Sequence, residues 1–182
     1  MTANPPENLF QTILVPVDGS QQAASALALA FGVAQKYNAR IIVCNALEVR
    51  AIDTGQFFVV SDPDTVISDQ MRRASEEIVA VATQSARKAG VTRVEAFVRE
   101  GNPVQAILEL ARREKADLIV MGSHGHDGLK RLLLGSTTEG VIRRSAVPVL
   151  VVRQPDQAMR EEPVECEEDS MLRSFEFAKA LP

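Results

Sequence analysis

Five short apolar runs, separated by segments of helical pattern, constrain the fold of this chain more than any other feature of its sequence. Most of the runs are continuous stretches of Val, Ile and Leu, which is typical of parallel strands covered on both faces. The order is therefore β-α-β-α-β-α-β-α-β, and right-handed crossovers fold such an order into an open, doubly wound α/β sheet. The expected strands are 12–17 (TILVPV), 40–47 (RIIVCNAL), 93–99 (RVEAFVR), 117–122 (DLIVMG) and 147–153 (VPVLVVR).

The segments between these runs carry start and stop signals for helices. Ser20 can cap the first helix, and Gly90 can end the second, which is expected over about 64–89. Asn102-Pro103 supplies an N-cap followed by proline at the first helical position, and the fourth helix is expected to start at Ser136. The residues expected to face inward are Ala23, Leu27, Ala30, Phe31 and Ala34 on the first helix and Ile67, Met71, Ile78, Val81 and Ala82 on the second.

Composition and charge narrow the class of protein. A length of 182 residues suggests one main domain, and a net charge of -4 argues against a nucleic-acid scaffold. No apolar run approaches the roughly 18 residues of a membrane span, and the first residues lack the pattern of a signal peptide. Cys44 lies in an apolar run and Cys166 in an acidic stretch, so a disulfide is not expected. The expected location is the cytoplasm.

Two segments fall outside the repeating pattern of the expected domain, 1–153. The long connection 48–63 holds four adjacent apolar residues and suits either a loop that packs its own side chains or a flap or partner surface. The tail 154–182 carries eight acidic and three basic residues, a net charge of -5, which leaves +1 for the rest of the chain. We expect a disordered acidic extension, with a short docking helix over SMLRSFEFAKAL as the alternative.

The stretch GSHGHDGLKRLLLGSTTEG (122–140) joins the fourth expected strand to the fourth helix. Glycines at the carboxyl end of a strand let a ligand approach the backbone, and the free N–H groups of a following helix attract phosphate. Lys130 and Arg131 would add long-range attraction. A purely structural interpretation stays open, because Ser136-x-x-Glu139 is also a capping box and glycines after a strand can simply form a turn.

This stretch resembles the nucleotide-binding branch of the universal stress protein family. The family motif is G-x2-G-x9-G-[S/T], and GSHGHDGLKRLLLGS matches each fixed position. The resemblance extends to ILVPVDGS (13–20) and SAVPVLVVR (145–153), covers about residues 10–153, and leaves the tail unmatched. It implies a five-stranded, Rossmann-like parallel sheet of the adenine nucleotide alpha hydrolase-like type, with strand order 3-2-1-4-5. It also implies binding of ATP, or of AMP or ADP.

The resemblance also implies roles for individual residues. Asp18 should reach the adenosine, Pro16 and Val17 should line its pocket, and Ala46 should hold the adenine through backbone groups. Asn45-Ala46 stands where the family usually has a His-Val pair, and Asp18 is alternatively a cap or turn residue. Met121 belongs to the expected binding set, and the residues expected around the ribose and phosphates are Gly122, Ser123, Gly125, Gly135, Ser136 and Thr137.

His124 and His126, with Asp127, raise the question of a metal site. A third histidine is lacking in the sequence, so exposed loop histidines or contact with the nucleotide are the favoured interpretations. A Mg²⁺ or Mn²⁺ ion carried by the ATP phosphates is a separate expectation.

Three classes of function remain open from the sequence. The leading one is a nucleotide-binding stress-response regulator that works through conformation and protein partners. The others are a slow ATP hydrolase or phosphotransferase, and an interaction module for which the nucleotide is incidental. The resemblance further implies a homodimer paired through the strand Val147–Arg153.

Overall fold

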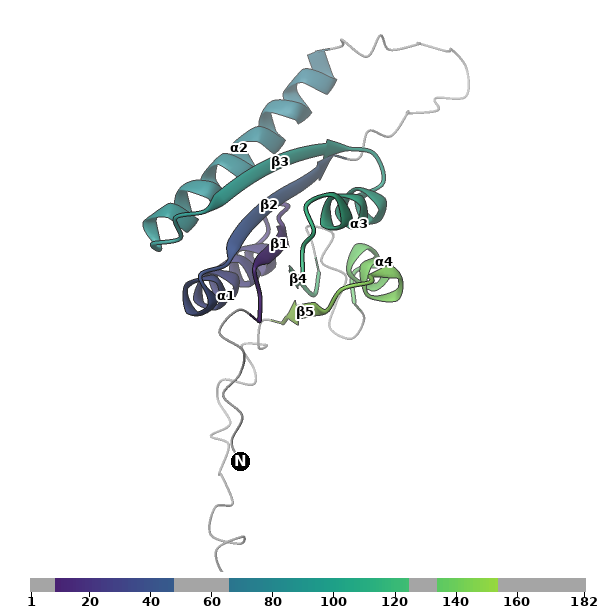
Figure 1. Ribbon diagram of the computed structural model, residues 1–182. Coiled ribbons are helices and arrows are strands. Elements are labelled where there is room, and N and C mark those ends of the chain that lie inside the picture. The colour runs from purple at the N-terminus through teal and green to yellow at the C-terminus, as the bar shows by residue number, and fades with distance from the viewer. Residues whose placement is uncertain (1–8, 48–65, 125–133, 154–182) are drawn as a thin grey trace, which may run out of the picture.

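The computed structural model describes residues 9–47, 66–124 and 134–153, and these residues form a single sheet with helices on both sides (Figure 1). The connection 48–63 and the tail 154–182 both lie outside the described residues. No helix in the described part of the chain is long and apolar enough to cross a membrane. The elements are β1 (Thr12–Pro16), α1 (Gln21–Tyr37), β2 (Arg40–Leu47), α2 (Val66–Lys88), β3 (Val94–Glu100), α3 (Pro103–Arg113), β4 (Leu118–Gly122), α4 (Ser136–Arg144) and β5 (Val149–Val152).

The sheet has the order β3-β2-β1-β4-β5, and its strand pairs are parallel. Helices α1 and α2 cover one face, and α3 and α4 cover the other (Figure 1). The chain winds outward from β1 to β3, crosses back through α3, and continues from β4 to β5. The winding direction therefore reverses between β1 and β4, and the expected fold class and strand order are confirmed.

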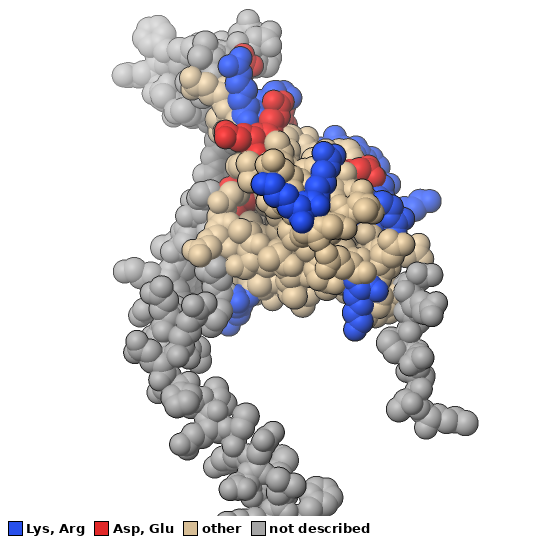
Figure 2. Space-filling view, turned by 90° about the vertical axis from the view of Figure 1, so that its left-hand side faces the viewer, with Lys and Arg blue, Asp and Glu red and all other residues tan. Residues whose placement is uncertain are grey.

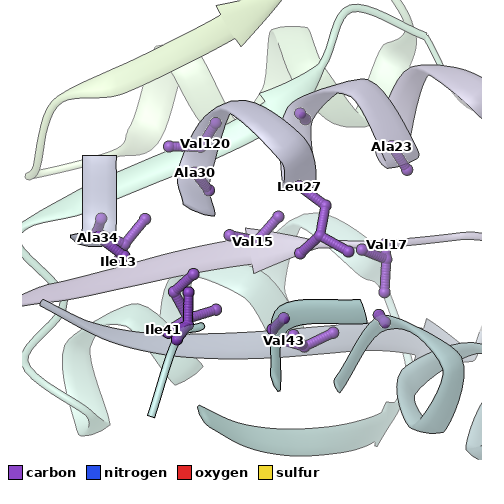
Figure 3. Packing of buried hydrophobic residues seen from close by; sticks show 14 of the residues in the cluster. Ile13, Val15, Val17, Ala23, Leu27, Ala30, Ala34, Ile41, Val43 and Val120 are labelled. Atoms are coloured by element: carbon purple, nitrogen blue, oxygen red, sulfur yellow. The ribbon is translucent and has the colours of Figure 1, made fainter. Parts of the chain in front are cut away.

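The core is built from small and branched side chains. On the α1 face, Ala23, Leu27 and Ala30 lie over alternate residues of the central strands, including Val15 and Val43 (Figure 3). The opposite face packs Leu14, Ile42 and Ile119 against residues of α3 and α4. Because both faces are covered, the central strands are apolar at nearly every position, and this made them visible in the sequence.

The expected helix signals are confirmed at three ends. The Ser20 side chain accepts a hydrogen bond from the Ala23 N–H at 3.2 Å, and the Asn102 side chain accepts one from the Gln105 N–H at 3.2 Å, with Pro103 at the start of α3. Gly90 follows α2 with φ of 86°, a left-handed conformation that favours glycine.

The expected inward face of α2 was partly wrong. Met71 and Val81 are 39% and 57% exposed, whereas Ala82 is buried and Ile78 is half-buried. The side chain of Ile67 lies outside the described set. The residues that α2 buries against β2 and β3 are Ser75, Val79, Ala82 and Ala86, which recur at helical spacing.

The surface on the side of α1 is largely uncharged. Lys36 is the single charged residue of α1, and the face shown in Figure 2 has a wide area free of acidic and basic side chains. Charged groups of both signs lie side by side above this area (Figure 2). Most charged side chains on this face therefore lie away from α1.

Candidate functional site

The carboxyl ends of β1 and β4 form the candidate site. These two strands are neighbours in the sheet, with Ile13 paired to Leu118 and Leu14 to Ile119. The winding direction of the chain reverses between them, and in open α/β sheets ligands bind at the carboxyl ends of the strands beside such a reversal. The segments that follow β1 and β4 are the ones in which the sequence predicted binding residues.

The chain leaves β1 through a segment fixed by the end of β2. The Val17 N–H donates to the Cys44 carbonyl at 2.7 Å, and the Asn45 side-chain amide donates to the Val17 carbonyl at 2.7 Å. Asn45 is 6% exposed, so its amide forms this bond away from water. In the sequence, Asn45 stood out only as a departure from the family pattern, although a polar residue within an apolar strand indicates such a hydrogen-bonding role.

Asp18 lies where β1 turns into α1. Its carboxylate accepts a hydrogen bond from the Ser20 N–H at 3.0 Å, and its side chain is half-buried. Gly19 between them has φ of 84°. The turn role that the sequence left open for Asp18 is therefore present.

The chain leaves β4 through a second fixed segment, which also holds the start of α4. The Ser123 N–H donates to the Val152 carbonyl at 3.0 Å, and the Ser123 carbonyl accepts from the Gly135 N–H at 2.8 Å. The buried Thr138 hydroxyl donates to the Gly122 carbonyl at 2.9 Å. Two parts of the glycine motif that are separate in sequence are thereby brought together.

Gly122 has a packing role that the sequence did not reveal. A Cβ atom at this position would lie 2.9 Å from the Cβ of Gln22 and 3.0 Å from its backbone carbon. The space beside Gly122 is therefore occupied by the first turn of α1. Close approach of a helix, rather than of a ligand, accounts for glycine here.

Helix α4 starts at Ser136 as expected, but the capping box that the sequence left open as an alternative does not form. Gly135 is the N-cap, Ser136 is already the first helical residue, and among the described residues no side chain caps this end. The Glu139 carboxylate instead lies 2.8 Å from the Arg143 guanidinium on the exposed side of the helix. The first N–H groups of α4 therefore keep the partial positive charge that a capping carboxylate would have reduced.

His124 adds a polar side chain to this junction. Its Nδ1 lies 3.1 Å from the Ser123 hydroxyl oxygen. Its Nε2 is buried, and no described residue provides a hydrogen-bond partner for it. Because an unpaired buried nitrogen is costly, a polar ligand atom or a water molecule at this position would lower the free energy of the site.

The remaining predicted residues are placed as follows. Pro16 and Ala46 are half-buried at the ends of neighbouring strands, and Met121 is 4% exposed within the core beneath α3 and α4. Ser136 and Thr137 form the first turn of α4. Five residues lie outside the described part of the chain: Gly125, His126, Asp127, Lys130 and Arg131.

The described residues offer anion binding more readily than metal or thiol chemistry. No three histidine, cysteine or acidic side chains come together as a metal site within the described ranges, which omit His126 and Asp127. Burial raises the pKa of the Cys44 thiol to about 12, so this thiol stays protonated and unreactive at neutral pH. The first turn of α4, which begins at Ser136 without a side-chain cap, and the adjacent Ser123 hydroxyl are the kinds of donor suited to a phosphate or a similar anion.

Comparison with known proteins identifies relatives of the whole folded region. The model of the universal stress protein family matches residues 9–153. A universal stress protein of Thermus aquaticus is 37% identical over 145 residues, which cover 80% of this chain and 100% of that protein. The family match ends at residue 153, where the acidic tail begins.

Solved structures share the fold. The universal stress protein UspA from Lactobacillus plantarum superposes with a TM-score of 0.68 at 26% identity, covering 79% of this chain and 97% of that one. A universal stress protein solved in complex with cAMP gives a TM-score of 0.59 at 33% identity, with the same two coverages. The neighbour with cAMP is a protein that binds an adenine nucleotide.

Proposed function

This chain belongs to the universal stress protein family, and from that premise we propose that it binds an adenine nucleotide and acts as a stress-response regulator. The nucleotide is ATP, or AMP or ADP, and its site lies at the carboxyl ends of β1 and β4. Regulation would operate through conformation and protein partners rather than through rapid catalysis.

The junction of Ser123 with Gly135 carries this proposal. It places the uncapped start of α4 directly beside the end of β4, so that the first turn of α4, at Ser136 and Thr137, follows immediately after a residue bonded to Ser123. Gly135 has φ of -59° and ψ of 147°, a conformation open to any L-residue. The backbone does not demand glycine there, so a close approach by phosphate is the reason that we assign to it.

The adenosine would lie toward β1 and β2. Pro16, Val17 and Ala46 lie at the ends of these adjacent strands, and the Asp18 carboxylate, in the turn that follows β1, would accept hydrogen bonds from ribose hydroxyls. Asn45 fixes the Val17 carbonyl, so this part of the pocket would be preorganised. The related protein that binds cAMP supports an adenine nucleotide as the ligand class.

Calorimetric titration of the full chain tests the proposal. We expect saturable binding of ATP, and weaker binding that persists with AMP because the adenosine contacts lie apart from the glycine segment. Gly125→Val and Gly135→Val should each abolish ATP binding, and Gly32→Ala on α1, where a Cβ meets nothing within 4 Å, is the matched control. Unchanged ATP affinity in both valine variants would refute the proposal.

Turnover of bound ATP should be slow or absent. Donors for phosphate suffice for binding, whereas hydrolysis also requires an oriented water and groups that stabilise the transition state more than the ground state. Glu139 is engaged with Arg143 on the exposed side of α4. Phosphate release with Mg²⁺ or Mn²⁺ should therefore stay well below the ~10 s⁻¹ typical of enzymes. A rate near that value, lost in Asp127→Asn without loss of ATP affinity, would instead support an ATP hydrolase.

A homodimer through β5 is the second part of the proposal. β5 is an edge strand, and its Leu150 side chain is 38% exposed. An apolar edge with free backbone groups favours pairing with a second copy across a two-fold axis. Light scattering at micromolar concentration should give twice the mass of the chain, and Val151→Lys should shift it toward the monomer without unfolding. A clean monomer for the unaltered chain would contradict the dimer.

A further inference from the structure

A groove of about 680 Å³ lies between α3 and the edge strand β3, away from the proposed nucleotide site. It exists because α3 packs mainly over β2 and leaves part of the neighbouring edge strand uncovered. The lining residues are Arg72 from α2, Val98, Arg99 and Glu100 from β3, and Ala106, Glu109, Leu110, Arg112 and Arg113 from α3.

The charge of this groove is positive. Its lining has four arginines and two glutamates, a net charge of +2. The guanidinium groups of Arg99 and Arg113 lie 5.5 and 5.1 Å from the centre of the Phe97 ring, which holds both of them beside the groove.

Two of the four arginines are available to an acidic partner. Arg72 pairs with Glu100, and Arg113 lies 2.9 Å from Glu114. For Arg99 and Arg112, no ion pair forms with any carboxylate in the described part of the chain. A chain with several closely spaced carboxylates would satisfy both.

Such a stretch exists within this molecule. Residues 161–169 (EEPVECEED) contain six acidic residues and no basic ones. They lie in the tail beyond the family match, which ends at residue 153. We propose that the acidic stretch 161–169 docks in the arginine groove of its own chain. This proposal is independent of nucleotide binding, because the groove borders β3 whereas the nucleotide site lies beyond β1 and β4.

The length of the tail permits this contact. Strands β5 and β3 are separated by four strand spacings of roughly 4.8 Å, or about 19 Å across the sheet. The eight residues from Gln154 to Glu161 span up to about 26 Å when extended, and the acidic stretch itself adds more. Pro163 favours an extended backbone before it, which suits a groove along an edge strand.

The two cysteines provide a direct test. Cys44 is 1% exposed and its thiol pKa is about 12, so a thiol-reactive spin label attached under native conditions should modify Cys166 within the acidic stretch. Amide NMR signals of the full-length chain then report which surface the label approaches. Docking predicts strong broadening for residues 97–100 and 106–113, and none for α1 on the opposite face.

The arginines and the salt dependence identify the cause of the broadening. The double variant Arg99→Gln/Arg112→Gln should lose it, as should the unaltered chain in about 1 M salt, where charges beyond about 3 Å are screened. The matched control Arg87→Gln/Lys88→Gln, at the exposed end of α2, should keep it. Broadening that is absent, that lies elsewhere, or that survives in the Arg99/Arg112 variant would overturn the proposal.

Mixing separates docking within one chain from docking between copies. Isotope-labelled chains without a spin label are combined with spin-labelled chains that lack the isotope. The proposal is supported if the groove amides broaden when the spin label and the isotope are on the same chain, but not when they are on different chains in the mixture. Broadening of equal strength in the mixture would overturn it in favour of a second copy as the occupant.

Discussion

The end of β4 and the start of α4 each place a motif glycine beside the proposed site, yet they do so for different reasons. At Gly122 a side chain is excluded by the protein itself, since a Cβ would lie 2.9 Å from the Cβ of Gln22. At Gly135 the backbone has ordinary φ and ψ values and the helix start is uncapped by any described side chain. A single sequence motif therefore combines a glycine that close packing requires with one whose backbone conformation any L-residue could adopt.

The difference between Gly122 and Gly135 predicts that one glycine affects the stability of the fold and the other affects nucleotide binding. Gly122 closes α1 onto the sheet, so its substitution should act on folding. Gly135 faces the region where we place phosphate, so its substitution should act on affinity. Measuring both quantities for both positions tests whether the two glycines have distinct roles.

Gly135→Val should give the largest effect, a loss of ATP affinity of about 100-fold or more, or roughly 3 kcal/mol. The branched side chain would occupy the space assigned to phosphate, while the native φ of -59° remains accessible to valine. Gly135→Asp sharpens the test, because an aspartate would cap α4 and stabilise the helix while repelling phosphate. If calorimetry shows that the aspartate variant still binds ATP tightly, Gly135 does not face phosphate, and the proposed difference in role between Gly122 and Gly135 is wrong.

Gly122→Ala should lower the free energy of unfolding by about 1–3 kcal/mol. The added methyl group would meet the backbone of Gln22 at 3.0 Å, which cannot move as a flexible side chain could. Urea denaturation of the nucleotide-free protein measures the change. A variant as stable as the parent chain would show that α1 adjusts freely at this contact.

Asn45→Ala extends the comparison to the end of β2, with an expected loss of about 1–2 kcal/mol in unfolding free energy. The buried Val17 carbonyl would lose its 2.7 Å partner, and the segment that precedes Asp18 would lose its anchor. We expect a smaller decrease in ATP affinity than for Gly135→Val, because Asn45 positions backbone rather than facing phosphate. A decrease in affinity without any loss of stability would assign Asn45 to the ligand instead.

Gly32→Ala should have the smallest effect, a gain in stability of about 0.5–1 kcal/mol with unchanged ATP affinity. Nothing lies within 4 Å of a Cβ at this exposed helical position. Thermal unfolding measures the change, and a loss of affinity would show that the assay responds to substitutions remote from the site.

The fold was predictable because its strongest physical requirement is local in the sequence. Continuous burial of the central strands leaves apolar runs, and the predicted range 40–47 coincides with β2. Asn102-Pro103 and Gly90 similarly mark helix ends through their own backbone chemistry. The family motif then located the strand ends at which the candidate site lies.

What the sequence could not provide depends on contacts between distant segments. The buried face of α2 follows Ser75, Val79 and Ala86, whose small or polar side chains compete poorly with Met71 and Val81 in a hydrophobicity pattern. The Ser136-x-x-Glu139 pattern fits a capping box, but Gly135 bonds to the Ser123 carbonyl and becomes the N-cap itself. The tight contact of Gly122 with Gln22 joins residues that are a hundred positions apart.

The hydrogen bond from the Gly135 N–H to the Ser123 carbonyl closes the base of the segment between these two residues. A second bond, from the Thr138 hydroxyl to the Gly122 carbonyl, reinforces the same closure. Loop-closure entropy changes slowly with length, by only about 0.6 kcal/mol for each doubling. Chain topology alone would therefore tolerate insertions between the two ends. The spacing of nine residues between Gly125 and Gly135 is therefore not required by loop closure.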